Sequence, residues 1–123
     1  MLGKFQVVAT IPETDLARAK AFYADTLGLS ATVETPFSIR FACGGGSELS
    51  IFKRGPCKAD HTLAHFEVDD IEACVAGLRG KGVTFLEYET PKTVNFIAEI
   101  GPARGAWLKD PDGNILGLRQ AKT

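Results

Sequence analysis

The chain has 123 residues and a mass of 13.2 kDa, so we expect a single domain over residues 1–123. Hydrophobic residues make up 45% and charged residues 24%, a balance that excludes intrinsic disorder, collagen and coiled coil. Lys and Arg number 14 against 15 Asp and Glu, which leaves no basic surplus for binding nucleic acid. No apolar run approaches the ~20 residues that cross a bilayer, and the N-terminus lacks a signal-peptide pattern. We therefore expect a cytoplasmic protein with neither nucleic-acid nor membrane partners.

The cysteine pattern argues against a structural zinc site. Cys43, Cys57 and Cys74 are an odd number, and no C-x-x-C pair is present. We expect them to be small free thiols that are buried or half-buried.

The first half of the chain predicts a strand, a helix and three further strands. Residues 6–11 are rich in β-branched side chains, and Pro12 is expected to stop this strand. Thr14 or Asp15 caps a helix over residues 16–27, and Gly28 ends it. Further strands are predicted over residues 30–34, 37–43 and 48–53, with Gly-Gly-Gly-Ser as the turn between the last two.

The second half repeats this plan after a turn-rich linker at residues 54–60. Asp69 or Asp70 is expected to cap a helix that Gly80 and Gly82 end, and residues 90–104 are expected to form a long polar loop or lid. Strands are predicted over residues 61–68, 83–88, 105–109 and 114–119.

This repeat indicates an α+β protein made of two β-α-β-β-β modules, about residues 5–54 and 61–120. Neither module is long enough to bury its own sheet well. We therefore expect both to form one curved mixed sheet with the helices outside. The concave face of such a sheet is a natural pocket.

Four segments carry a resemblance to a known family. Residues 15–29 read D-L-x-R-A-x-x-F-Y-x-x-x-L-G-L, and residues 66–73 read F-E-V-D-D-I-E-A. Residues 78–83 read L-R-x-K-G-V, and residues 106–116 read A-W-L-K-D-P-D-G-N-I-L. Together they resemble the vicinal oxygen chelate superfamily of glyoxalase I, bleomycin-resistance proteins and extradiol dioxygenases. The resemblance implies paired modules, a small-molecule ligand and a homodimer, but this fold hosts both enzymes and binding proteins.

The resemblance also implies four metal-ligand positions, which fall on Val8, Ser50, Leu63 and Gly117 in this sequence. Three of these have no side-chain donor and a serine is a poor one, so we expect neither a metal site nor another cofactor. His61 and His65 flank Leu63, but a regular strand would separate them by ~13 Å, too far for one ion. Glu48 or Glu67 joining one histidine would still make only two donors.

Strand alternation supplies the candidate ligand-binding residues on the concave face. Of these we favour Ser50, Phe52, His61 and His65 for contact with a ligand. The resemblance adds Trp107, because members of the family often line the ligand pocket at that place. Arg40, on a neighbouring predicted strand, could reach an anion through a forked contact. The full inward-facing set also includes Val8, Thr10, Glu48, Leu63, Glu67, Ile115, Gly117 and Arg119. His65 and Glu67 are the acid–base candidates, but with ~7 Å between them along the strand we expect no direct hydrogen bond.

Two functions remain open at this level. The first is a metal-free protein that binds or sequesters a small aromatic or amphipathic molecule. The second is a metal-dependent lyase, isomerase or dioxygenase of the lactoylglutathione lyase kind, which would need a different register or unusual ligands.

Overall fold

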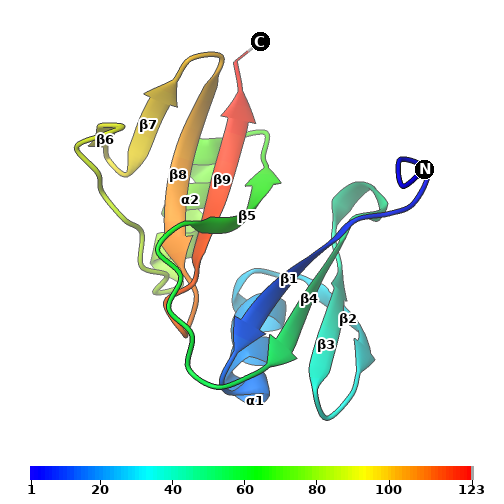
Figure 1. Ribbon diagram of the computed structural model, residues 1–123. Coiled ribbons are helices and arrows are strands. Elements are labelled where there is room, and N and C mark those ends of the chain that lie inside the picture. Colours follow the sequence, from blue (N-terminus) through cyan, green and yellow to red (C-terminus); the bar gives the residue numbers. More distant parts are fainter. Residues whose placement is uncertain (123) are drawn as a thin grey trace. The chain divides into compact units, whose positions relative to one another are not determined.

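A computed structural model describes residues 1–122 of the chain. They divide into two compact units, Met1–Cys57 and a second that begins at Lys58, a division inside the predicted linker. The predicted α+β class and the repeated module are confirmed, because each unit contains a mixed sheet and one helical segment that packs on it (Figure 1). The expectation of a single sheet is wrong: the described strands form one four-stranded and one five-stranded sheet.

The first unit has the strand order β1-β4-β3-β2. Strand β1 runs parallel to β4, whereas β3 is antiparallel to both of its neighbours. The elements are β1 (Val8–Glu13), α1 (Leu16–Lys20), a π-helix over Ala21–Thr26, β2 (Ser30–Glu34), β3 (Ser38–Ala42), a 3-10 turn over Gly44–Gly46 and β4 (Glu48–Lys53).

Strand β1 continues through Pro12, although the proline was expected to stop it. Pro12 pairs with Phe52 in the parallel ladder. Because β1 is the edge strand of its sheet, a residue without an N–H can be accommodated there.

The helical segment of the first unit starts and stops where the sequence predicts. The Asp15 carboxylate accepts a hydrogen bond from the N–H of Arg18 at 3.1 Å, which caps α1. Gly28 ends the segment with φ 81°, in the left-handed region that favours glycine. Tyr23 is fully buried, and its ring lies 5.9 Å from that of Phe41.

The second unit repeats this topology with one strand added. Its order is β5-β9-β8-β7-β6; β5 is parallel to β9, and the other pairs are antiparallel. The elements are β5 (Thr62–Glu67), α2 (Ile71–Gly80), β6 (Thr93–Val94), β7 (Ile97–Ile100), β8 (Ala103–Lys109) and β9 (Ile115–Ala121). Helix α2 packs against β8 and β9, and Asp70 caps it by accepting from the N–H of Ala73 (Figure 1).

Two predicted elements of the second unit are wrong. Residues 83–88 do not form a strand; Phe85 only makes an isolated bridge to Leu108. The reason is that β7 already occupies the edge of β8 along Ala103–Gly105. Residues 90–104 are also no open loop, because they contain the β6–β7 hairpin and the start of β8.

The core of each unit follows the predicted alternation. In the first sheet the buried set includes Ile11, Ile39, Phe41, Leu49 and Ile51, and in the second Ala106, Leu108, Leu116 and Leu118. In the second unit this face carries α2, which leaves the other face available to a ligand. No helix in the described residues is long and apolar enough to cross a membrane.

Candidate functional site

A hollow of about 430 Å³ lies over β8 and β9 in the second unit. Its lining includes Trp107, Gly105 and Gly117, whose side-chain positions alternate with those of the buried residues facing α2. Other residues of these two strands, of β5 and of the end of β7 with its following turn complete it: Thr62, His65, Ile100, Pro102, Ala103, Arg104, Leu118 and Arg119. Mostly apolar walls with a few polar groups are typical of small-molecule sites.

Trp107 is held in a defined position in this hollow. A Cβ atom on Gly105 would lie 3.4 Å from the indole, so the absence of a side chain there leaves room for the ring. Tyr88 contacts the indole edge-on, with 5.2 Å between ring centroids. Trp107 therefore offers a flat, partly exposed aromatic surface of fixed orientation.

Gly117 opposes Trp107 in the antiparallel ladder and His65 in the parallel one. A Cβ atom at this position would lie 3.0 Å from the Cβ of His65 and 3.4 Å from Cγ2 of Thr62. A side chain at residue 117 would therefore displace His65 or Thr62. Gly117 is also one of the four positions at which the sequence resemblance implies a metal ligand. Glycine supplies no donor at this position, and a larger residue would fit only if His65 moved. The residue present therefore does not fit the metal-ligand role that the resemblance implies.

His65, Glu67 and Arg119 form a chain of charged contacts at the side of the hollow. The Nε2 atom of His65 lies 2.6 Å from Oε2 of Glu67, and Nη1 of Arg119 donates to Oε1 at 2.6 Å. The expectation that His65 and Glu67 do not bond is wrong. The ~7 Å of backbone between residues i and i+2 of a strand is spanned because both side chains lie on one face and turn toward each other.

The electrostatics of Glu67 follow from its two partners. The Arg119 hydrogen bond first, and the His65 contact second, hold the pKa of the Glu67 carboxyl below its usual range. Glu67 therefore stays ionised as an acceptor and fixes the orientation of Arg119 and His65. This arrangement positions donor groups at the side of the hollow that Trp107 lines.

The start of β5 departs from strict alternation. The register with β9 shifts between Thr62 and Ala64, and β5 begins one residue later than predicted. As a result Thr62 lines the hollow together with His65, whereas His61 precedes the strand and its ring lies 3.6 Å from the Asp60 carboxylate. The bulge could not be read from the sequence, because no glycine or proline marks it.

The remaining candidates, Ser50, Phe52 and Arg40, belong to the first unit. Arg40 and Ser50 are register partners on β3 and β4, and Phe52 follows on the same face. Nε of Arg40 lies 3.5 Å from the Glu48 carboxylate. Arg40 therefore pairs with a carboxylate of the chain itself, and its forked contact to a ligand anion stays a prediction.

Other chemistry finds little support in the described residues. Within residues 1–122 no three His, Cys, Asp or Glu side chains gather in a group that could hold a metal ion. The three cysteines are free, and Cys57 is exposed rather than buried. Burial raises the pKa of the Cys43 thiol, with a contribution from Glu48, and burial followed by Asp70 and Asp69 raises that of Cys74. Neither thiol is set up as a nucleophile, since the thiolate is the reactive form.

Comparison with protein families agrees with the paired modules. Residues 5–118 match the model of the Glyoxalase/Bleomycin resistance protein/Dioxygenase superfamily. The chain belongs to this superfamily. A comparison with functionally curated sequences gives no match.

Solved structures of the glyoxalase/bleomycin-resistance superfamily align over nearly the whole chain. TnmS3, an antibiotic binding protein from Streptomyces sp. CB03234, is 26% identical with a TM-score of 0.76 and 99% coverage of both chains. A glyoxalase/bleomycin resistance protein from the same organism is 27% identical with a TM-score of 0.68, covering 94% of this chain and 100% of that one. Lactoylglutathione lyase from Agrobacterium tumefaciens, at 18% identity and a TM-score of 0.74, covers 95% of this chain and 93% of its own and shares the fold alone.

Two residues that position Trp107 in this superfamily member, Gly105 and Tyr88, had no functional signal in the sequence. Gly105 was predicted to begin a strand, but its role under the indole depends on which side Trp107 takes. Tyr88 was assigned to a strand and instead reaches Trp107 from an irregular segment. Counting back two residues from Trp107 along the strand would have placed Gly105 on the same face.

Proposed function

We propose that this superfamily member binds a small aromatic or amphipathic molecule in the hollow of its second unit, without a catalytic metal. The observation that carries the proposal is the Trp107 indole, which lies against Gly105 and opposes Gly117 in a 430 Å³ hollow. A planar ligand would stack on the indole, because aromatic faces gain from offset or edge contacts beyond simple burial. Arg119 and His65 would meet the polar end of the ligand.

Two further observations support binding over metal catalysis. Val8, Leu63 and Gly117 offer no donor where the superfamily's metal-dependent members place ligands, and a side chain at residue 117 would crowd His65. TnmS3, which is 26% identical over essentially the full length, is an antibiotic binding protein.

The indole N–H resonance tests the site directly, because Trp107 is the only tryptophan in the chain. Titration of the ¹⁵N-labelled protein with 4-nitrophenol should move this resonance saturably, and cyclohexanol at equal concentration should move it much less. Trp107→Leu should weaken 4-nitrophenol binding by about tenfold, as measured by calorimetry. Phe37→Leu, an exposed aromatic of the first unit, is the matched control. Equal binding by Trp107→Leu and the unmodified protein would place the ligand elsewhere.

The second candidate function is metal-dependent lyase, isomerase or dioxygenase chemistry, and it rests on His65 and Glu67 as two donors beside the hollow. Elemental analysis of protein purified without chelator separates the two. We expect a metal-to-chain ratio near zero and no lactoylglutathione lyase activity after exposure to nickel, zinc, manganese or iron. A ratio near one with turnover, abolished by His65→Ala, would replace the binding proposal.

We also propose a homodimer. The first unit exposes large apolar side chains, with Val7 88%, Phe37 73% and Val33 54% accessible. Contact with a second copy of the chain would remove these side chains from water, which is favourable. Sedimentation equilibrium should give about twice the chain mass of 13.2 kDa, and a monomer mass at every concentration would contradict the proposal.

A further inference from the structure

A second and larger groove lies on the helix side of the five-stranded sheet, between α2 and the β6–β7 hairpin (Figure 1). Its volume is about 620 Å³, against about 430 Å³ for the hollow beside Trp107. Val75 and Ala76 of α2 face Val94 and Ile97 of the hairpin across it. Arg104 borders both cavities from the central strand β8, but Trp107 does not line this groove.

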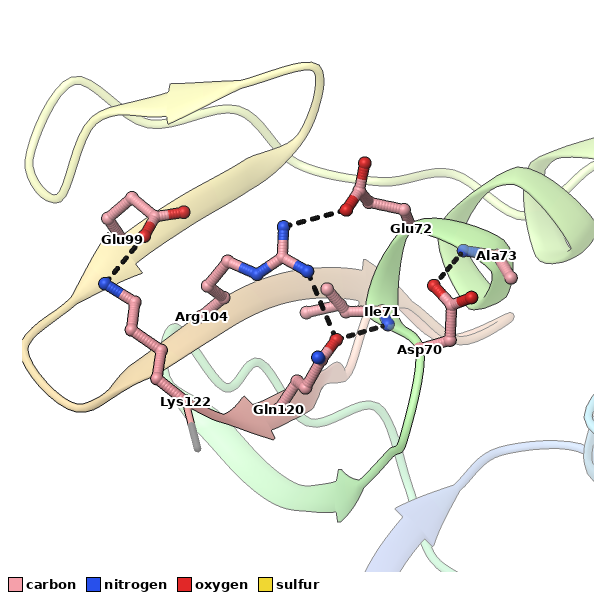
Figure 2. Close-up of polar contacts among 8 residues, drawn as sticks. All are labelled: Asp70, Ile71, Glu72, Ala73, Glu99, Arg104, Gln120 and Lys122. Atoms are coloured by element: carbon pink, nitrogen blue, oxygen red, sulfur yellow. Dashed lines mark hydrogen bonds and ion pairs between the residues drawn. The ribbon is translucent and has the colours of Figure 1, made fainter.

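Most of the charged groups in this groove are already paired within the chain. Nη1 of Arg104 donates to the Glu72 carboxylate at 3.0 Å, and Nη2 donates to Oε1 of Gln120 at 3.3 Å (Figure 2). Glu99 lies 2.7 Å from the Lys122 ammonium. Both carboxylates that line the groove, Glu72 and Glu99, are thus paired with cations of the chain. Neither is available to neutralise a further cation in the groove.

Two cations of the groove have no such partner. In the described part of the chain, neither Arg79 at the end of α2 nor Lys92 before β6 forms an ion pair with a carboxylate. The carbonyl groups of Leu78 and Arg79 at the end of α2 already accept hydrogen bonds from the N–H groups of Lys81, Gly82 and Val83. They therefore do not compete with the groove for the Arg79 side chain.

The Arg79 guanidinium is instead held over an aromatic face. Its Cζ atom lies 4.2 Å from the centroid of the Phe96 ring. Stacking of this kind covers one face of the planar cation and leaves the N–H donors at its edge free. A guanidinium with a free edge binds carboxylate or phosphate through two parallel hydrogen bonds.

The turn that presents Phe96 is held in an uncommon conformation. Asn95 and Phe96 have φ of 51° and 71°, and a bulky residue rarely occupies this left-handed region. The N–H of Phe96 donates to the Glu87 carboxylate at 3.2 Å, and its ring lies 6.4 Å from that of Phe85. Two separate contacts thus hold Phe96, whose ring positions Arg79. Such contacts are expected where an uncommon backbone conformation is retained.

We propose that this groove is a second binding site, specific for a small molecule that carries an oxyanion, either carboxylate or phosphate, on an apolar body. Arg79 binds the oxyanion through its free edge, and Lys92 adds a second positive charge to the lining of the groove. Val75, Val94 and Ile97 contact the apolar body. The site is independent of the aromatic ligand proposed for the hollow beside Trp107.

Amide chemical shifts of the full chain at low ionic strength test this site, since screening by salt would weaken an exposed charge contact. Phenyl phosphate and benzoate should each shift the amide resonances of Arg79, Asn95 and Phe96 saturably. Inorganic phosphate lacks the apolar body and benzyl alcohol lacks the charge, so each should bind at least about fivefold more weakly than phenyl phosphate. Shifts with phenyl phosphate but not with benzoate would assign the site to phosphate compounds.

Paired variants locate the charge contact. Arg79→Gln should weaken phenyl phosphate binding about tenfold or more and Lys92→Gln about threefold, while Arg54→Gln in the first unit should change it less than about twofold. Phe96→Leu should also weaken binding, since the guanidinium loses its support. The indole resonance of Trp107 reports in each variant that the second unit remains folded. Absence of shifts at Arg79 and Phe96 with both oxyanions, or equal losses in Arg79→Gln and Arg54→Gln, would overturn the proposal.

Discussion

The two units place different side chains on the same backbone frame. Thr10 and His65 lie the same number of residues before their capping aspartates, and each pairs with a residue of the parallel neighbour, Ser50 or Gly117. The next strand then contributes Arg40 in the first unit and Trp107 in the second. At these three corresponding positions the first unit thus carries Thr, Ser and Arg, and the second unit carries His, Gly and Trp.

This difference explains why a hollow is found in the second unit. Gly105 and Gly117 supply no side-chain volume, so the indole and the His65 ring border open space. At the corresponding place in the first unit, Arg40 extends toward Glu48 and pairs with it. The repeated topology therefore provides a similar surface in both units, and two glycines leave space for a hollow on the surface of the second.

The helices are also attached differently. An aspartate caps both, but in the second unit Oε1 of Gln120 on β9 also accepts the N–H of Ile71 at 2.8 Å and a donor from Arg104 (Figure 2). In the first unit the N-cap bond comes from Asp15. The second helix is thus bonded directly to the last strand of the sheet.

The largest expected contrast concerns the turns between the last two strands of each unit. Asp110 is 5% exposed, and its carboxylate accepts from the N–H groups of Asp112 and Asn114 and from the Asn114 amide. Asp110→Ala should lower the free energy of unfolding by about 3 kcal/mol, because three donors lose their acceptor. Ser47→Ala, in the exposed glycine turn of the first unit, should cost less than about 1 kcal/mol. Urea unfolding measures both; equal costs would contradict the contrast.

Adding a side chain at Gly117 should make this part of the second unit resemble the first, which has Ser50 at the corresponding position. Gly117→Ala places a methyl group 3.0 Å from the Cβ of His65, so we expect a loss of about 2 kcal/mol in unfolding free energy from overpacking. The indole N–H resonance of Trp107 should shift as well. Ser50→Ala at the counterpart position is the control and should change stability by less than about 0.5 kcal/mol. An unshifted indole resonance in Gly117→Ala would show that Gly117 does not shape the hollow.

Removing the hydrogen bond between Gln120 and the start of α2 should affect the second unit and not the first. Gln120→Ala leaves the N–H of Ile71 and one donor of Arg104 without their acceptor, and should cost about 1–2 kcal/mol. Hydrogen exchange of the first turn of α2 should accelerate, while exchange in α1 stays constant. Gln120→Glu, which keeps an acceptor oxygen, should restore most of the protection.

The contacts of Glu67 with Arg119 and His65 should make the stability of the protein depend on pH in the acid range. The pKa of Glu67 is lowered in the folded state, chiefly by the Arg119 hydrogen bond, so the folded protein holds this proton less tightly than the unfolded chain. Its contribution to stability is therefore present above the ordinary glutamate pKa of about 4.3 and is lost as the pH falls through the lower folded value.

Accordingly, Glu67→Gln should be less stable than the unmodified protein near neutral pH, and the gap should close in acid. Urea midpoints across this range measure it. Glu48→Gln controls for the loss of a surface carboxylate in the first unit. A gap between Glu67→Gln and the unmodified protein that stays constant into acid would contradict the assignment.

The smallest expected effect is on the surface of the first unit. Lys20 and Glu34 lie 3.0 Å apart with 42% and 50% of their side chains exposed. Glu34→Gln should change the unfolding free energy by less than about 0.5 kcal/mol, since solvent and salt screen such pairs. A larger loss would mean that the first unit depends on surface charge more than its buried contacts suggest.

The sequence by itself determined the repeated module, the helix caps at Asp15 and Asp70 and the alternation of buried residues, because each follows from local geometry and period. It also named His65 and Trp107 as candidate contacts to a ligand. It failed for residues 83–88 and 90–104, since which segment pairs with the free edge of β8 is a competition between distant residues.

Only the tertiary structure decided the details of the candidate site. The bulge between Thr62 and Ala64, the contact between His65 and Glu67 and the space left by Gly117 depend on side chains from three strands meeting at once. Local pattern sets which face a residue takes, but only packing sets which side chains touch and where a cavity remains.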